Sequence, residues 1–194
     1  MRRKRYLVRI ANSDSIPVSQ YRNVREKLRS ALEVWGCILN SSRISSVAIE
    51  ADFFAPDDGA SEKAVGLLSR IDRLLTVTVL SDEAEERGDK GEVLERSKLL
   101  FNEERFWEVH ETVEGIWRKA EGAEKTVQQG IILYAAAYVH HQKNEPETAL
   151  AMLKRAMGKM VWPGDSYHCF DLGLMKRKAS GMIADGTLEV FKLP

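Results

Sequence analysis

The sequence predicts an α+β protein in which a βαββαβ domain precedes an all-helical bundle. In residues 1–80, short segments rich in β-branched residues alternate with segments whose apolar residues recur at helical spacing. From residue 93 onward, the helical period dominates. Residues 81–92, between the two parts, are densely charged and nearly free of apolar side chains. We therefore predict a domain at 1–80, a charged linker at 81–92 and a helical bundle at 93–194.

The elements of the first domain follow from its apolar pattern and its turn residues. We expect strands at residues 5–10, 37–39, 47–53 and 74–80, and helices at residues 17–35 and 61–73. Gly36 ends the first helix, and the turn at 56–59 precedes the second. This order is typical of a ferredoxin-like sandwich, an antiparallel sheet with two helices on one face.

Composition and charge argue against nucleic acid as a partner. The 29 Lys and Arg residues balance the 29 Asp and Glu residues, so no global field attracts phosphate. An RNA-binding sheet of this topology needs a basic and aromatic third strand, whereas this strand contains Glu50 and Asp52. We interpret the basic run at residues 2–5 as a solvated terminus.

Location follows from apolar stretches and cysteines. The sequence contains no apolar stretch near the ~20 residues that cross a bilayer, and the charged start is not followed by the apolar core of a signal peptide. Cys37 and Cys169 lack the spacing of metal ligands, so we expect reduced, packed thiols. These features predict a cytoplasmic protein that does not enter a membrane.

The second domain is expected to contain four or five helices. They cover residues 93–100, 101–117, 124–142, 146–160 and 171–183, with a break near Phe101 and Asn102. The helix at 124–142 is apolar nearly all round, which indicates a buried central helix. An extended tail at 188–191 could pack on either domain.

The helix that ends at Trp117 has an apolar stripe containing two ionisable groups. On a helical wheel the stripe gathers six residues: Phe106, Trp107, Val109, Val113, Ile116 and Trp117. His110 and Glu114 fall inside it, so we predict that both are mostly buried and touch the 124–142 helix. Four residues are predicted to face solvent: Glu104, Arg105, Glu108 and Thr112. Buried polar groups need partners, so the stripe predicts a site.

The motifs of this region resemble the domain of unknown function 309 family. They run in the order Phe-Asn, aromatic, His-Glu-x-x-Glu-x-x-Trp, Gln-Gly and an Ala-rich helix, over about residues 95–185. The resemblance implies a small all-helical fold without an established activity. Lys143-Asn144 stands where the family has a Gly-Asn turn, and residues 1–80 lie outside the resemblance.

One interpretation of the site is a metal centre. A zinc metalloprotease helix has two histidines four residues apart, but here the second is Glu114. A third ligand must come from another helix, and His140 is the best candidate because it shares a face with Gln129. His110, Glu114 and His140 would then hold a divalent ion such as zinc, which would support a metal-assisted hydrolase.

Two other interpretations need no metal. In one, His110 and Glu114 hydrogen-bond each other or Gln129 and only tie two helices together. In the other, Trp107 and Trp117 wall a pocket in which polar residues orient a small ligand or partner. Its polar set is His110, Glu111, Glu114, Gln129 and His140, with Glu111 at its edge. We expect ligand or partner binding, with the hydrolase as the alternative.

The sequence names no catalytic residue. Neither cysteine has an activating context, and the chain has no nucleophile elbow, P-loop or dinucleotide-binding glycine pattern. Ligand identity and homo-oligomerisation are left open at this point.

Overall fold

The computed structural model describes residues 3–80 and 88–194. The chain folds into two compact units, each of which packs mainly within itself. The sheet unit consists of residues 3–80 with 142–144, and the helical unit consists of the other described residues. Residues 81–87 of the predicted linker lie outside the described residues. No helix within the described ranges is long and apolar enough to cross a membrane.

The sheet unit has the predicted order of elements. Its strands are β1 (Lys4–Ala11), β2 (Ile38–Ile44), β3 (Ala48–Ala55) and β4 (Leu74–Leu80). Its helices are α1 (Tyr21–Glu33), preceded by the 3-10 turn η1 (Val18–Gln20), and α2 (Asp58–Leu68). The strands lie in the order β2-β3-β1-β4, and each neighbouring pair is antiparallel. The predicted α+β class with an antiparallel sheet is confirmed.

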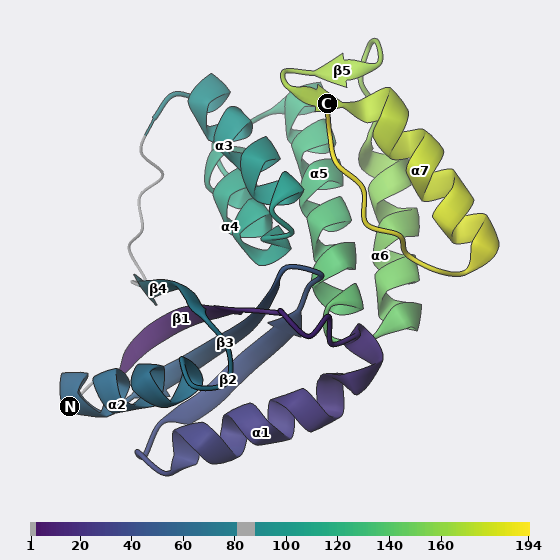
Figure 1. The fold of residues 1–194 in the computed structure, drawn as a ribbon. Helices are drawn as coiled ribbons and strands as arrows, with labels where there is room; N and C mark the ends of the chain where they lie inside the picture. Colours follow the sequence, from purple (N-terminus) through teal and green to yellow (C-terminus); the bar gives the residue numbers. More distant parts are fainter. Residues whose placement is uncertain (1–2, 81–87) are drawn as a thin grey trace. The chain divides into compact units, whose positions relative to one another are not determined.

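Alternation along the strands directs one side of the sheet toward the two helices. Tyr6, Val8 and Ile10 of β1 pack in one cluster with residues of α1 and α2. Figure 1 shows both helices on the same face of the sheet. Asp57 caps α2 by accepting a hydrogen bond from the Ala60 amide.

The acidic residues of β3 are paired across the sheet. Glu50 forms ion pairs with Arg9, at 3.2 Å, and with Arg43, at 2.5 Å. Asp52 accepts two hydrogen bonds from the Arg5 guanidinium, at 2.8 and 2.7 Å. Because buried carboxylates need such partners, these arginines account for charged residues in strands that are otherwise largely buried.

The helical unit contains α3 (Lys90–Asn102), α4 (Phe106–Trp117), α5 (Gly122–His141), α6 (Pro146–Lys159) and α7 (Leu172–Asp185). The first helix begins three residues before the predicted start, because Asp89 and Glu92 form a capping box. The break between α3 and α4 lies at Glu103 to Arg105 instead of Phe101 and Asn102, with Glu104 at a φ of 58°. A short hairpin, β5 (Ser166–Tyr167) and β6 (Phe170–Asp171), was not predicted.

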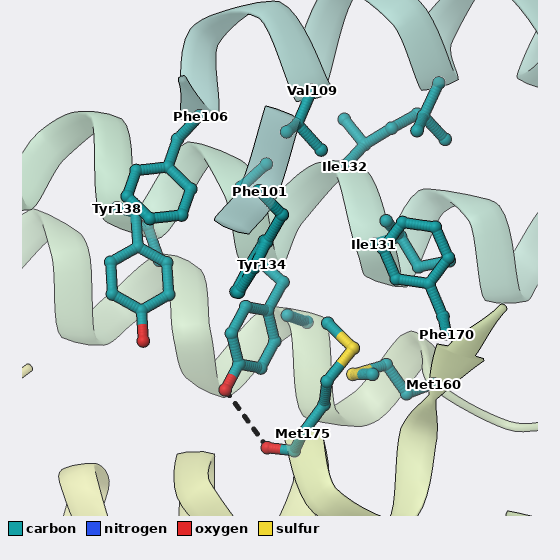
Figure 2. Close-up of a cluster of buried hydrophobic side chains, with 14 of the residues drawn as sticks. Phe101, Phe106, Val109, Ile131, Ile132, Tyr134, Tyr138, Met160, Phe170 and Met175 are labelled. Atoms are coloured by element: carbon teal, nitrogen blue, oxygen red, sulfur yellow. Dashed lines mark hydrogen bonds between the residues drawn. The ribbon is translucent and has the colours of Figure 1, made fainter. Parts of the chain in front are cut away.

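Aromatic rings form the centre of the helical unit. The rings of Phe106 and Tyr138 stack with centroids 4.4 Å apart, and Phe101 packs edge-on against both. Figure 2 shows these rings together with Tyr134, whose hydroxyl donates a hydrogen bond to the Met175 carbonyl oxygen. As predicted for α5, many of its residues are buried.

The C-terminal tail packs on the helical unit. The Asn102 side chain forms two hydrogen bonds with the backbone of Leu193. Its amide nitrogen donates to the Leu193 carbonyl oxygen at 2.9 Å, and its oxygen accepts from the Leu193 amide at 2.8 Å. The Tyr138 hydroxyl donates to the Glu189 carbonyl oxygen at 2.6 Å. The tail is therefore anchored by side chains of α3 and α5.

Candidate functional site

The buried face of α4 differs from the predicted face. Phe106, Val109 and Val113 are buried as expected, but Thr112, predicted to face solvent, is buried as well. The reason is that α3 packs against α4, and residues of both helices line the surface around Thr112. The core direction is therefore rotated away from His110 and Glu114.

The prediction that His110 and Glu114 are mostly buried is met only in part, because both side chains are partly buried and neither belongs to the core. Their side chains are 31% and 28% exposed, and that of Glu111 is 50% exposed. Conversely, Glu104 is buried, and Arg105 and Glu108 are half-buried in a two-bond ion pair with both distances at 2.7 Å. The hydrogen bonds that Arg105 donates to Glu108 raise the pKa of the guanidinium.

His110, Glu111 and Glu114 form one cluster on the half-exposed flank of α4. The His110 Nδ1 atom lies 3.3 Å from Glu111 Oε1 and 3.8 Å from Glu114 Oε2. One ligand atom from each of the three residues lies within 4.8 Å of the others. The i and i+4 spacing brings His110 and Glu114 together, because those positions are neighbours on a helix surface.

Arg118 contacts the same cluster from the next turn. Its Nη2 atom donates to Glu114 Oε1 at 3.0 Å, which is the ion pair expected from i and i+4 spacing. The other oxygen of Glu114 faces His110. The carboxylate is thus shared between a guanidinium and an imidazole.

Two other predicted site residues form no hydrogen bond or ion pair with this cluster in the described parts of the chain. His140, in the last turn of α5, pairs through Nδ1 with the Glu145 carboxylate and does not belong to the cluster of candidate metal ligands. Gln129 is half-buried, and among the described residues no hydrogen bond joins it to His110 or Glu114. The structure therefore does not assemble the predicted ligand set of His110, Glu114 and His140.

The two tryptophans border the cluster along α4. Trp107 and Trp117 are both half-buried and pack on the edge of the core. The Lys125 ammonium lies 5.0 Å from the centroid of the Trp117 ring, a cation–π distance. With His110 and Glu114, they form a stripe that is partly open to solvent.

A second polar group, which the sequence analysis missed, lies at Gln128 instead of Gln129. Gln128 is fully buried, and its Nε2 atom donates to the Tyr167 hydroxyl at 2.7 Å. That hydroxyl donates to Glu124 Oε1 at 2.9 Å, and Lys90 Nζ donates to the same oxygen at 2.6 Å. Helical spacing offers a signal for it, since the apolar residues Ile131, at i+3, and Ala135, at i+7, place Gln128 on an apolar face of α5.

The family model described as "Domain of unknown function (DUF309)" matches part of the helical unit and ends before the predicted limit near residue 185. Residues 94–152 match DUF309. The match includes the His110 cluster and Gln128 but ends before Tyr167, and residues 1–80 lie outside it, as predicted. No curated protein matches the chain.

The turn in which the chain departs from the DUF309 pattern places Asn144 in the left-handed region. Asn144, which follows Lys143, has a φ of 57°. Asn tolerates this left-handed region better than most residues with a side chain, because its short polar side chain bonds locally. The turn between α5 and α6 thus needs no glycine before Asn144.

Glu124 should make the stability of the helical unit depend on pH. The hydrogen bond from Lys90 lowers the pKa of this carboxyl, burial opposes the effect, and Tyr167 adds to the lowering. Because the pKa of Glu124 is lower in the folded than in the unfolded state, its carboxylate stabilises the fold. This contribution is fully present above the ordinary Glu pKa of about 4.3 and is lost as the pH falls through the pKa of the folded state. We expect Glu124→Gln to lower the urea midpoint near neutral pH, and this difference from wild type to shrink below about pH 4.3.

Glu121→Gln is the matched control for this pH series. Glu121 is exposed just before α5, three residues from Glu124, so its replacement should not change the urea midpoint at any pH. A Glu124→Gln difference that stayed constant down to low pH would contradict the assigned cause.

Proposed function

We propose that the helical unit is a binding module whose ligand is a divalent transition-metal ion held by His110, Glu111 and Glu114. The single observation behind this proposal is that one nitrogen and two carboxylate oxygens lie within 4.8 Å of one another on one flank of α4. This keeps the binding function expected from the sequence, and it replaces the third ligand, His140, with Glu111.

The distances between the candidate ligand atoms suit one ion. Zinc lies about 2.0–2.2 Å from nitrogen and oxygen ligands, so two ligands of one ion lie about 3–4 Å apart. The His110 Nδ1 atom lies 3.3 Å from an oxygen of Glu111 and 3.8 Å from an oxygen of Glu114. Small side-chain rotations of Glu111 and Glu114 would bring the three ligand atoms within reach of one ion.

The chemistry of the set favours zinc and its neighbours over magnesium. Imidazole suits zinc, copper and nickel, whereas magnesium prefers carboxylates and water. Three protein ligands leave at least one coordination position for water or for a group of a partner. Trp107 lies three residues before His110 and Trp117 three residues after Glu114 on the same helix, and both are only partly buried, so they are available to contact an apolar part of such a partner.

We do not extend the proposal to hydrolysis. The hydrolase alternative needs His140 as a ligand, and His140 pairs with Glu145 instead. We retain the cytoplasm as the expected location because both cysteines are free and Cys37 is buried in the sheet unit.

Zinc should stabilise the protein through this cluster. After removal of metal with a chelator, adding free zinc at about 100 times its Kd should raise the free energy of unfolding by about 2.7 kcal/mol. The increase should vanish in His110→Ala and in Glu114→Gln and persist in His140→Ala. Thermal melts of the four proteins, with zinc, with magnesium and with chelator, measure it.

The same melts separate binding from a structural role. Because His110 is 31% exposed, His110→Ala should change the metal-free stability by no more than about 0.5 kcal/mol. A metal-free loss of several times that size, together with wild-type melts that zinc leaves unchanged, would mean that His110 only supports the fold.

A further inference from the structure

A cleft at one end of the helical unit is lined by both charged and apolar groups. Its volume is about 310 Å³, and it lies where the start of α3, the end of α4 and the start of α5 meet. The residues relevant here are Lys90, Ile116, Lys119, Ala120, Glu124 and Gln128. None of them belongs to the His110 cluster, so the cleft is a separate feature.

Gln128, which lines the cleft, has an acceptor that is not used. Its Oε1 atom is buried and has no hydrogen-bond partner among the described residues. The neighbouring hydrogen bonds distinguish the side-chain oxygen of Gln128 from its nitrogen. The Tyr167 hydroxyl gives its only proton to Glu124, so it must accept from the Gln128 amide nitrogen. Leaving a buried acceptor unpaired costs free energy, and a ligand donor that reaches it regains that free energy.

The charges of the lining favour an anion. Lys90 and Glu124 neutralise each other at 2.6 Å, whereas no side-chain partner of the exposed Lys119 is found in the described parts of the chain. The lining residues therefore leave one positive charge uncompensated. An ammonium group on the ligand would be repelled by the uncompensated Lys119, so the donor for Gln128 should be neutral.

We propose that this cleft binds a small hydroxycarboxylate. Its carboxylate pairs with the Lys119 ammonium, its hydroxyl donates to Gln128 Oε1, and its carbon chain packs on Ile116 and Ala120. The volume agrees with this class, since 310 Å³ is at the lower end of the range of about 300–1,000 Å³ for small-molecule sites.

Titrations with matched small molecules test the ligand class. The probes are lactate, glycerate and gluconate, followed by calorimetry and by amide chemical shifts of Gly115 and Ala120. Sorbitol has the hydroxyls without the charge, and hexanoate has the charge without the hydroxyls. We expect at least one hydroxycarboxylate to bind about tenfold more tightly than both controls. A chelator in every titration keeps the result independent of metal at His110.

Variants locate the site. Lys119→Met should weaken the best probe about tenfold, and Gln128→Leu should remove its advantage over hexanoate. Lys154→Met, at an exposed position on α6, should change nothing. Lys119 is exposed, so its variant remains informative if Gln128→Leu does not fold. Equal binding of sorbitol or hexanoate, no binding of any hydroxycarboxylate, or an unchanged affinity in Lys119→Met would overturn the proposal.

Discussion

Replacing Phe101 with alanine should lower the free energy of unfolding of the helical unit by about 3–5 kcal/mol. Phe101 is 1% exposed, and its ring centroid lies 5.1 Å from that of Phe106, 5.8 Å from Tyr138 and 5.5 Å from Phe191. The truncation removes buried apolar area and leaves a cavity among rings that α3, α5 and the tail hold in place.

Urea unfolding followed by tryptophan fluorescence measures this loss, since three of the four tryptophans lie in the helical unit. Leu99→Ala is the control: Leu99 is two residues away on α3 and 62% exposed, so its truncation should cost no more than about 0.5 kcal/mol. Similar losses in the two variants would show that the aromatic cluster does not stabilise the unit as described.

Gly130→Ala should destabilise the same unit by about 1–3 kcal/mol, because α5 and α6 pack too closely for a methyl group. A Cβ atom at Gly130 would lie 2.7 Å from Met160 Cγ, 3.0 Å from the Met160 amide nitrogen and 3.1 Å from the Lys159 carbonyl carbon. The methionine side chain can move aside, but the two backbone atoms move only if the helices separate.

Gly181→Ala in α7 should stabilise the unit, in contrast to Gly130→Ala. A Cβ atom there meets nothing within 4 Å, so alanine should stabilise the helix by about 0.5–1 kcal/mol. Urea midpoints of the two variants should therefore shift in opposite directions from wild type. A neutral or stabilising Gly130→Ala would contradict the close approach of α5 and α6.

Local signals predicted much of the fold. The alternating segments predicted β1, β3 and β4, and the capping and turn residues placed most helix ends within a few residues of those observed. The prediction for β2 was too short, because its residues 40–44 include the polar run Asn40-Ser41-Ser42-Arg43, which we interpreted as a connection. The hairpin of β5 and β6 was missed because each strand has two residues, too few for a pattern. The anchoring of the tail was missed because Asn102 and Leu193 meet only in the folded unit.

In the candidate site, helical periodicity predicted which residues are neighbours on α4 but not which of them are buried. The spacing of His110 and Glu114 predicted that they would be neighbours on α4, and they are. Which face of α4 is buried depends on where α3 packs, and a helical wheel of α4 gives no information on α3. The burial of His110 and Glu114 was therefore overestimated. His140 was expected to bind one ion together with His110 and Glu114, whereas it pairs with the nearby Glu145, just after α5.

Cobalt(II) titration followed by visible absorption tests the metal proposal most directly, because the ion reports its own ligands. We expect d–d bands that saturate at one equivalent per chain, disappear in His110→Ala and Glu114→Gln, and are unchanged in His140→Ala. The absence of such bands in the wild-type protein, or their loss in His140→Ala with retention in His110→Ala, would contradict it.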